Sequence, residues 1–118
     1  MDYPRLTLDE LVDDLRTIMQ RHGLREAYVF GSRVRGDHLH RSDFDVLIVD
    51  ERYEGVPFLE RGTELLRDWP HVTPELELFC YTPLEFARGN TIIRAALRQG
   101  IRVVLEDQPL SASASPNS

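Results

Sequence analysis

The sequence predicts an α/β domain of two or three layers, in which strands alternate with helices. Strand-length apolar segments alternate along the chain with amphipathic segments of helix length. The 118 residues, of which 42% are hydrophobic and 29% charged, suit one globular core. We expect one domain over residues 1–106. Residues 107–118 are rich in Ser, Ala, Pro and Asn and should form a disordered tail, because they bury too little apolar surface to offset chain entropy.

The first predicted element is an amphipathic helix. Thr7 and Glu10 have the spacing of a capping box, with Thr7 as the N-cap. The apolar residues that follow recur at helical spacing: Leu8, Leu11, Val12, Leu15, Ile18 and Met19. Gly23 stands where a C-cap glycine belongs. Residues 26–30 then predict a short strand that runs into Gly31.

The middle of the chain predicts a strand, a helix and another strand. The apolar run over 44–49 is typical of a central strand covered on both faces. Pro57 can begin a second helix that ends before Pro70. Its apolar residues would be Phe58, Leu65, Leu66 and Trp69. Residues 75–81 alternate at their start and are rich in strand-forming residues.

The last predicted elements are an interrupted helix and a short strand. Residues 82–85 form a second capping box, with Pro83 at the first helical position. The dipeptide at 89–90 should interrupt this helix, which then continues to Gly100. Residues 101–105 predict the closing strand.

The charge composition limits the kinds of phosphate chemistry that are open to this chain. A net charge of −6 disfavours binding along a nucleic-acid duplex, which requires a basic face. All 14 basic residues are arginine, so a Walker-type phosphate loop and covalent AMP transfer on a lysine are both excluded. Any phosphate must therefore be held by arginine, backbone N–H groups and metal.

The remaining composition indicates a cytoplasmic protein. No apolar run approaches the ~20 residues of a membrane span, and the N-terminus lacks a signal-peptide pattern. The single cysteine, Cys80, excludes an internal disulfide and a zinc site of several cysteines. Cys80 is expected in the core of its strand.

Asp43 and Asp45 are the first candidate metal ligands. On a strand, residues i and i+2 project from one face with Cα atoms about 6–7 Å apart, so the two carboxylates repel unless a cation lies between them. Oxygen ligands favour magnesium or manganese over zinc, and two such ions can activate an attacking oxygen and clamp a phosphate. The alternative is an ordinary pair of loop-end carboxylates. The pair opens a buried strand, where charge is costly, and this favours metal.

The dipeptide Gly31-Ser32 is a candidate phosphate site at the end of a strand. Glycine permits close approach of the backbone, serine offers a hydroxyl, and a following helix would offer unpaired N–H groups. Arg33 and Arg35 supply positive charge nearby. In isolation the dipeptide would suggest a simple strand–turn–helix connection. The aspartate pair that follows it in the chain is what makes a phosphate site the more specific interpretation.

These motifs together resemble a known family. Gly31-Ser32-x-x-x-Gly36, followed by five residues and Ser42-Asp43-x-Asp45, is similar to the signature of the minimal nucleotidyltransferases in the DNA polymerase β superfamily. The resemblance spans about residues 7–106. It implies the nucleotidyltransferase fold, an α+β arrangement with a small mixed β-sheet and flanking helices. It also implies that Asp43 and Asp45 ligate two Mg²⁺ ions. The nucleotide-binding residues it implies are Gly31, Ser32, Arg33, Arg35 and Ser42.

The family also has a third carboxylate on a neighbouring strand. Glu77, six residues before Pro83, matches that position and is expected to be the third catalytic and metal-binding group. Glu75 competes with it, because strand alternation places both side chains on one face. A solvated strand face is the alternative explanation for both. We favour Glu77.

The resemblance implies transfer of AMP from ATP to a hydroxyl acceptor, with release of pyrophosphate. The chain is too short to add the second domain that larger relatives use to grip an acceptor. Minimal members commonly act beside a separate helical HEPN-type protein. In several such pairs the nucleotidyltransferase is an antitoxin that adenylylates a tyrosine of the HEPN toxin. Two alternatives remain: a catalytically inert nucleotide- or partner-binding module, and an adenylyltransferase acting on small-molecule antibiotics.

Overall fold

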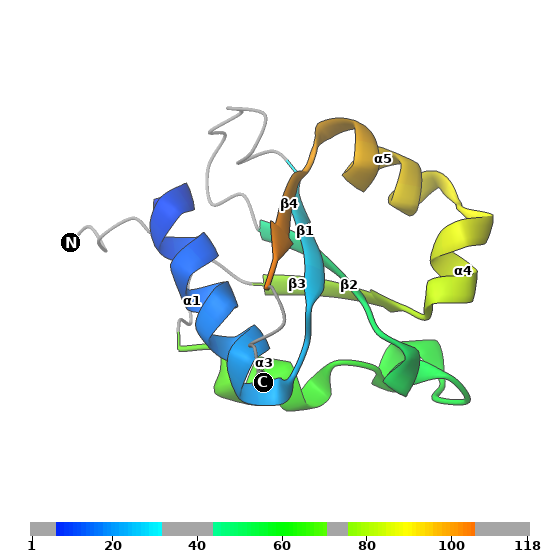
Figure 1. The fold of residues 1–118 in the computed structure, drawn as a ribbon, viewed down its shortest axis with the longest axis horizontal. Coiled ribbons are helices and arrows are strands. Elements are labelled where there is room, and N and C mark those ends of the chain that lie inside the picture. The colour runs from blue at the N-terminus through cyan, green and yellow to red at the C-terminus, as the bar shows by residue number, and fades with distance from the viewer. Residues whose placement is uncertain (1–6, 32–43, 71–75, 106–118) are drawn as a thin grey trace, which may run out of the picture.

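The computed structural model describes residues 7–31, 44–70 and 76–105 (Figure 1). The helices are α1 (Leu8–His22), α3 (Thr63–Asp68), α4 (Pro83–Arg88) and α5 (Thr91–Gln99), with single 3₁₀ turns at Glu51–Tyr53 and Phe58–Glu60. The strands are β1 (Glu26–Phe30), β2 (Phe44–Val49), β3 (Leu76–Tyr81) and β4 (Ile101–Val104). The expected tail at 107–118 lies outside the described residues, so its disorder stays a prediction.

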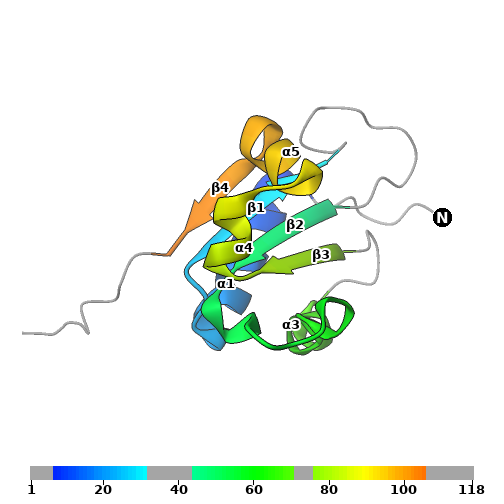
Figure 2. The same cartoon turned by 90° about the vertical axis from the view of Figure 1, so that its right-hand side faces the viewer.

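The four strands form one mixed sheet in the order β3-β2-β1-β4. β1 runs antiparallel to both β2 and β4, whereas β2 and β3 are parallel. Helices α1 and α3 cover one face of the sheet, and α4 and α5 cover the other (Figures 1 and 2). This arrangement confirms the prediction of an α+β fold with a small mixed sheet and flanking helices.

Strand alternation divides the core into two clusters, one on each face of the sheet. In β2, Val46 and Ile48 face α1, and Leu47 faces α5. All three side chains are fully buried. The continuous apolar run at 44–49 therefore has the cause expected from the sequence, since a central strand is covered on both sides.

The predicted start and end of α1 are confirmed. The backbone N–H of Glu10 donates to Thr7 Oγ1 at 3.1 Å, and the Glu10 carboxylate accepts from the N–H of Thr7 at 2.9 Å. Gly23 adopts a left-handed conformation with φ of 73° and ends the helix. The buried face of α1 consists of Leu11, Leu15, Ile18 and Met19.

The prediction of one helix from Pro57 to Trp69 is wrong. The segment contains a 3₁₀ turn, a break at Gly62 and the short helix α3. Gly62 has φ of 84°, and a Cβ placed on it would lie 2.9 Å from the sulfur of Cys80. The break brings the backbone against β3, where a side chain would not fit, and a continuous helix could not make this approach.

The break also places Arg61 beside β3. Its guanidinium donates to the carbonyl oxygen of Cys80 at 3.0 Å and to the Glu85 carboxylate at 2.7 Å. Arg61 thereby joins the 3₁₀ segment to the end of β3 and to α4.

The second capping box and the interruption between α4 and α5 are confirmed. Thr82 Oγ1 accepts from the N–H of Glu85 at 3.2 Å, with Pro83 at the first helical position. A new helix then begins at Thr91, because the Asn90 side chain accepts from the N–H of Ile93 at 2.8 Å. Among the described helices, none has the length and apolar character needed to cross a membrane.

Candidate active site

Three strand ends meet at one edge of the sheet. The end of β1 and the starts of β2 and β3 lie together because β1 is antiparallel to β2 and β2 is parallel to β3 (Figure 2). In this register Asp45 stands opposite Phe30 on one side and opposite Glu77 on the other. Strand pairing therefore brings together two predicted site residues that are 32 positions apart in the chain.

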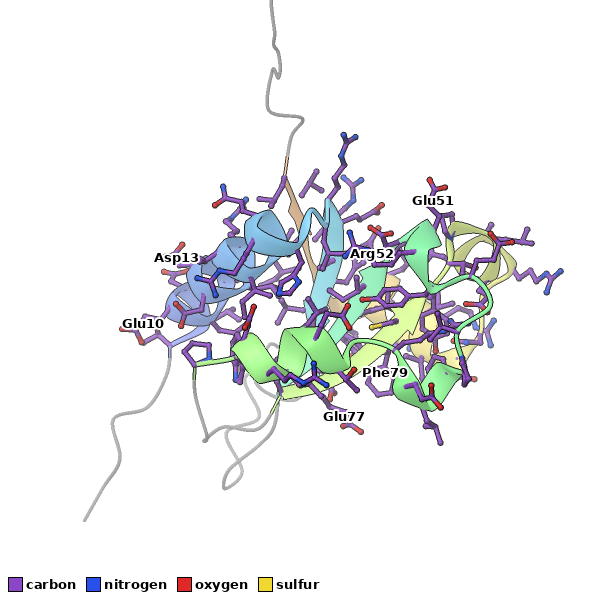
Figure 3. All side chains as sticks on the ribbon, turned by 90° about the horizontal axis from the view of Figure 1, so that it is seen from below. Glu10, Asp13, Glu51, Arg52, Glu77 and Phe79 are labelled. Carbon is purple, nitrogen blue, oxygen red and sulfur yellow. The ribbon has the colours of Figure 1, made fainter. Side chains whose placement is uncertain are left out.

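Asp45 and Glu77 project from the same face of the sheet. Paired residues of neighbouring strands point to the same side, and their backbones lie about 4.8 Å apart. Asp45 is half-buried, whereas Glu77 on the edge strand is exposed and points away from the body of the domain (Figure 3). Two carboxylates this close repel each other, so a cation between them would lower the electrostatic free energy of the pair.

Gly31 packs directly against the Asp45 carboxylate. The residue is buried and has φ of 105°, a conformation that side-chain-bearing residues rarely adopt. A Cβ placed on Gly31 would lie 2.6 Å from Asp45 Oδ2 and 3.2 Å from its Cγ. The sequence suggested that this glycine lets the backbone approach a phosphate. The structure shows a second reason for glycine, which is room for the carboxylate itself.

Aromatic side chains pack next to the two carboxylates on the same face of the sheet. Phe30, the pairing neighbour of Asp45, is 6% exposed, and its ring centroid lies 6.0 Å from that of Phe79. Phe79 is two residues beyond Glu77 on the same face of β3 and is half-buried (Figure 3). Neither ring was expected at the site from the sequence. The available signal was the alternation of strand residues, which puts Phe30 and Phe79 on the carboxylate face once the register is known.

Several predicted site residues lie outside the described parts of the chain: Ser32, Arg33, Arg35, Ser42 and Asp43, together with the competing Glu75. Among the predicted residues that are described, the structure brings together Gly31, Asp45 and Glu77.

The donor chemistry of the described carboxylates suits a hard divalent cation. Asp45 and Glu77 offer oxygen donors from adjacent strands, which are the ligands that Mg²⁺ prefers. Within residues 7–31, 44–70 and 76–105, no group of three or more His, Cys, Asp and Glu side chains is gathered to hold a metal ion. The other predicted donor, Asp43, lies outside the described residues. Asp45 and Glu77 could therefore supply part of the ligand set of a divalent ion, but they do not form a complete set by themselves.

Cys80 is a core residue, as expected, and not a nucleophile. Its side chain is 2% exposed, and burial raises the pKa of the thiol to about 11. The thiol is therefore protonated at neutral pH. Burial likewise raises the pKa of the neighbouring Tyr53, whose hydroxyl donates to Glu64 at 3.2 Å. This cluster lies on the α1 face, opposite the carboxylates, and serves packing.

Comparison with known families matches residues 9–98 to the model of the nucleotidyltransferase domain. The chain belongs to the nucleotidyltransferase domain family. A solved structure from Sulfolobus solfataricus, described as a "putative nucleotidyltransferase", is similar over 86% of this chain and 89% of the other, with a TM-score of 0.54 and 20% identity. This likeness shows a shared fold. Among curated proteins, no sequence matches the chain significantly.

Proposed function

We propose that the chain is a magnesium-dependent nucleotidyltransferase that moves AMP from ATP to an acceptor hydroxyl. Membership of the nucleotidyltransferase domain family supports nucleotidyl transfer in general. The observation that carries the finer proposal is the pairing of Asp45 with Glu77, with Gly31 packed against Asp45, where three strand ends meet. Such an edge presents carboxylates to solvent on one rigid scaffold.

In this proposal the carboxylates act as metal ligands and orient the reacting groups. Asp45 and Glu77, completed by Asp43, hold two divalent ions; when bound, these ions supply Lewis-acid stabilisation of the phosphate and of the attacking oxygen. Because Gly31 has no side chain, the Asp45 carboxylate can lie directly against the backbone at this position. Glu77 is exposed on the outermost strand, so an acceptor approaches from its side.

The remaining nucleotide contacts are proposed for the segment after β1. Ser32 and the backbone of Gly31 bind the β- and γ-phosphates, with Arg33, Arg35 and Ser42 assisting. Since the sequence contains no lysine, the negative charge of the triphosphate must be neutralised by arginine and metal. The acceptor oxygen forms a bond to the α-phosphorus, and the bond from that phosphorus to the oxygen bridging to the β-phosphate breaks. Pyrophosphate leaves, and the hydroxyl proton passes to solvent.

The proposed acceptor is a tyrosine hydroxyl on a helical protein of the HEPN type, which would make this chain an antitoxin. Two features support a protein acceptor: the net charge of −6, which disfavours a nucleic-acid backbone, and the exposure of Glu77 at the sheet margin. The pairing with a HEPN protein rests on the resemblance of the sequence motif to minimal nucleotidyltransferases.

Calorimetric titration with ATP, in the presence and absence of Mg²⁺, tests the metal-dependent site. We expect Mg²⁺ to strengthen ATP binding, and Asp45→Asn to remove that gain, because one negative ligand is lost. Asp13 is an exposed carboxylate on the outer face of α1 (Figure 3). Asp13→Asn is therefore the matched control, and it should bind ATP as the unaltered protein does. Equal affinity with and without Mg²⁺ would reject the metal site.

The acceptor is tested by incubating the protein with α-labelled ATP and Mg²⁺ in lysate from its own host. Label on one small protein, found as AMP on tyrosine by mass spectrometry, is the expected result. Label only on RNA, or only on a small molecule, would refute the protein acceptor and leave the chemistry intact. Tight binding of ATP without transfer to any acceptor would instead favour an inert binding module.

A further inference from the structure

Positive charge is concentrated in one segment of this acidic protein. Residues 86–105 contain four arginines and no acidic residue, whereas the whole chain has a net charge of −6. Removing the +4 of this segment leaves −10 for the remainder (−6 − 4 = −10). The segment consists of the end of α4, all of α5 and β4. The four arginines of this segment therefore lie on three consecutive elements of the fold.

The outward surface of α5 carries part of this charge. Ile93 and Ala96 point inward and are 1% and 0% exposed, and the opposite side presents Arg94, Leu97 and Arg98. Leu97 is 55% exposed and lies beside the two arginines on the helix surface. Positions 94, 97 and 98 are neighbours on a helix surface, since they are spaced by three and four residues. We call these three residues, together with Arg88, the α5 basic face.

Arg88 extends this face across the turn between α4 and α5. It is exposed at the end of α4. A Cβ placed on Gly89 would lie 4.0 Å from Arg94 Nη1, so the Arg94 guanidinium reaches back over the same turn. Among the described residues, no carboxylate forms an ion pair with Arg88, Arg94 or Arg98, whereas Arg102 is paired with Glu26 at 3.3 Å. Within the described parts of the chain, the three arginines thus add like charge that no carboxylate neutralises.

The α5 basic face lies on the same side of the sheet as the candidate active site. Ile93 and Ala96, which anchor α5, pack in one buried cluster with Phe30. Phe30 is the strand neighbour of Asp45. A partner bound to the outer surface of α5 is therefore held on the face that carries both carboxylates (Figure 2).

The composition of this face indicates which class of partner it fits. An exposed aliphatic side chain beside arginines is typical of a protein interface, where apolar and arginine side chains occur together. Single-stranded nucleic acid is bound by aromatic stacking platforms, and the α5 basic face has no aromatic residue. One helical turn separates Arg94 from Arg98, about 6 Å, so a long polyanion would also meet the acidic remainder of the surface.

We propose that the α5 basic face is a docking site for an acidic, amphipathic segment of the acceptor protein. Glutamate or aspartate side chains of the partner pair with Arg88, Arg94 and Arg98, while an apolar side chain packs on Leu97. The face is separate from the carboxylates, so its role is to recruit and orient the acceptor. The partner's role rests on the proposed protein acceptor, but the contact itself requires no nucleotide.

The test measures the fluorescence anisotropy of a labelled helical peptide as the full chain is added without nucleotide. The peptide carries glutamates along one side and leucines beside them. We expect binding that weakens as salt rises, because exposed charges are screened. Arg94→Glu and Arg98→Glu together should weaken it about ten-fold or more. Arg67→Glu, an exposed arginine on α3, is the control and should change it less than two-fold. The same peptide with glutamine in place of glutamate should bind about ten-fold more weakly.

Three results would overturn the proposal. The first is equal peptide binding by the Arg94→Glu/Arg98→Glu variant and the Arg67→Glu control. The second is equal or tighter binding of a labelled single-stranded oligonucleotide through the same arginines. The third is self-association in analytical ultracentrifugation that the double reversal abolishes, which would make a second copy of this chain the occupant. Loss of peptide binding with ATP turnover unchanged would separate this face from the chemistry.

Discussion

Replacement of Gly31 by alanine is the sharpest test of the site geometry. The added Cβ would lie 2.6 Å from Asp45 Oδ2, and ordinary contact begins near 3.4 Å, so the carboxylate must move by about 0.8 Å. A misplacement of about 1 Å in a catalytic group can cost about 100-fold in rate. Because φ is 105°, alanine also brings backbone strain of about 1–3 kcal/mol. We therefore expect Gly31→Ala to lower kcat/KM by one to two orders of magnitude, with a modest loss of stability.

Gly55→Ala provides the matched control for backbone strain. Gly55 has φ of 78°, and a Cβ placed on it would meet no atom within 4 Å. This variant should lose about 1 kcal/mol in urea unfolding and keep its activity. The measurements are the free energy of unfolding and the rate of pyrophosphate release for both variants. Activity of Gly31→Ala within two-fold of the unaltered protein would refute the inference that this glycine positions Asp45.

Three further predictions concern single side chains. Glu77→Gln should reduce turnover by orders of magnitude in a single-turnover assay, while its affinity for ATP stays within a few-fold of the unaltered protein's. Glu75→Gln should have a much smaller effect, and the reverse result would assign the third carboxylate to Glu75. Cys80, with its pKa raised to about 11, should resist a thiol-specific reagent at pH 8 until urea unfolds the chain; rapid modification of the folded protein would contradict its burial. The pKa of Glu85 is lowered, first by its hydrogen bond from Arg61, so Glu85→Gln should reduce stability above the ordinary glutamate pKa of 4.5, by a small amount because solvent screens this partly exposed pair. That loss should shrink as acid protonates Glu85 through its lower folded pKa, and a loss independent of pH would show that the ion pair contributes nothing.

Local signals predicted most of the secondary structure, because the information for a helix end lies within a few residues. The capping boxes at Thr7 and Thr82 and the glycine after α1 each act through short-range backbone contacts. The helix assigned from Pro57 to Trp69 failed for the opposite reason. Its apolar spacing suits a helix, but the close approach of Gly62 to Cys80 comes from a strand 14 or more residues later in the chain. No local pattern contains that contact.

The sequence predicts the residue types of the candidate site but not how the strands that carry them pair. Alternation placed Glu75 and Glu77 on one face of β3 and left open which of them stands beside Asp45. The register of the parallel pair decides this, since a slip of two residues would exchange the two glutamates without moving any side chain to the other face. Parallel register depends on the segment that joins the strands and on the packing of both faces, which are long-range properties of the fold.

The position of the carboxylates explains how the domain can carry an unfavourable pair of charges. Asp45 and Glu77 stand at strand starts, where Asp45 is half-buried and Glu77 exposed, while the fully buried residues of β2 lie in the strand interior. Repulsion between the two charges is therefore moderated by solvent and does not act inside the core. Because the charges and the core are separated, substitutions at the carboxylates should alter binding and turnover far more than stability. A substitution at Gly31 should affect binding, turnover and stability, because this residue has a positive φ and contacts Asp45.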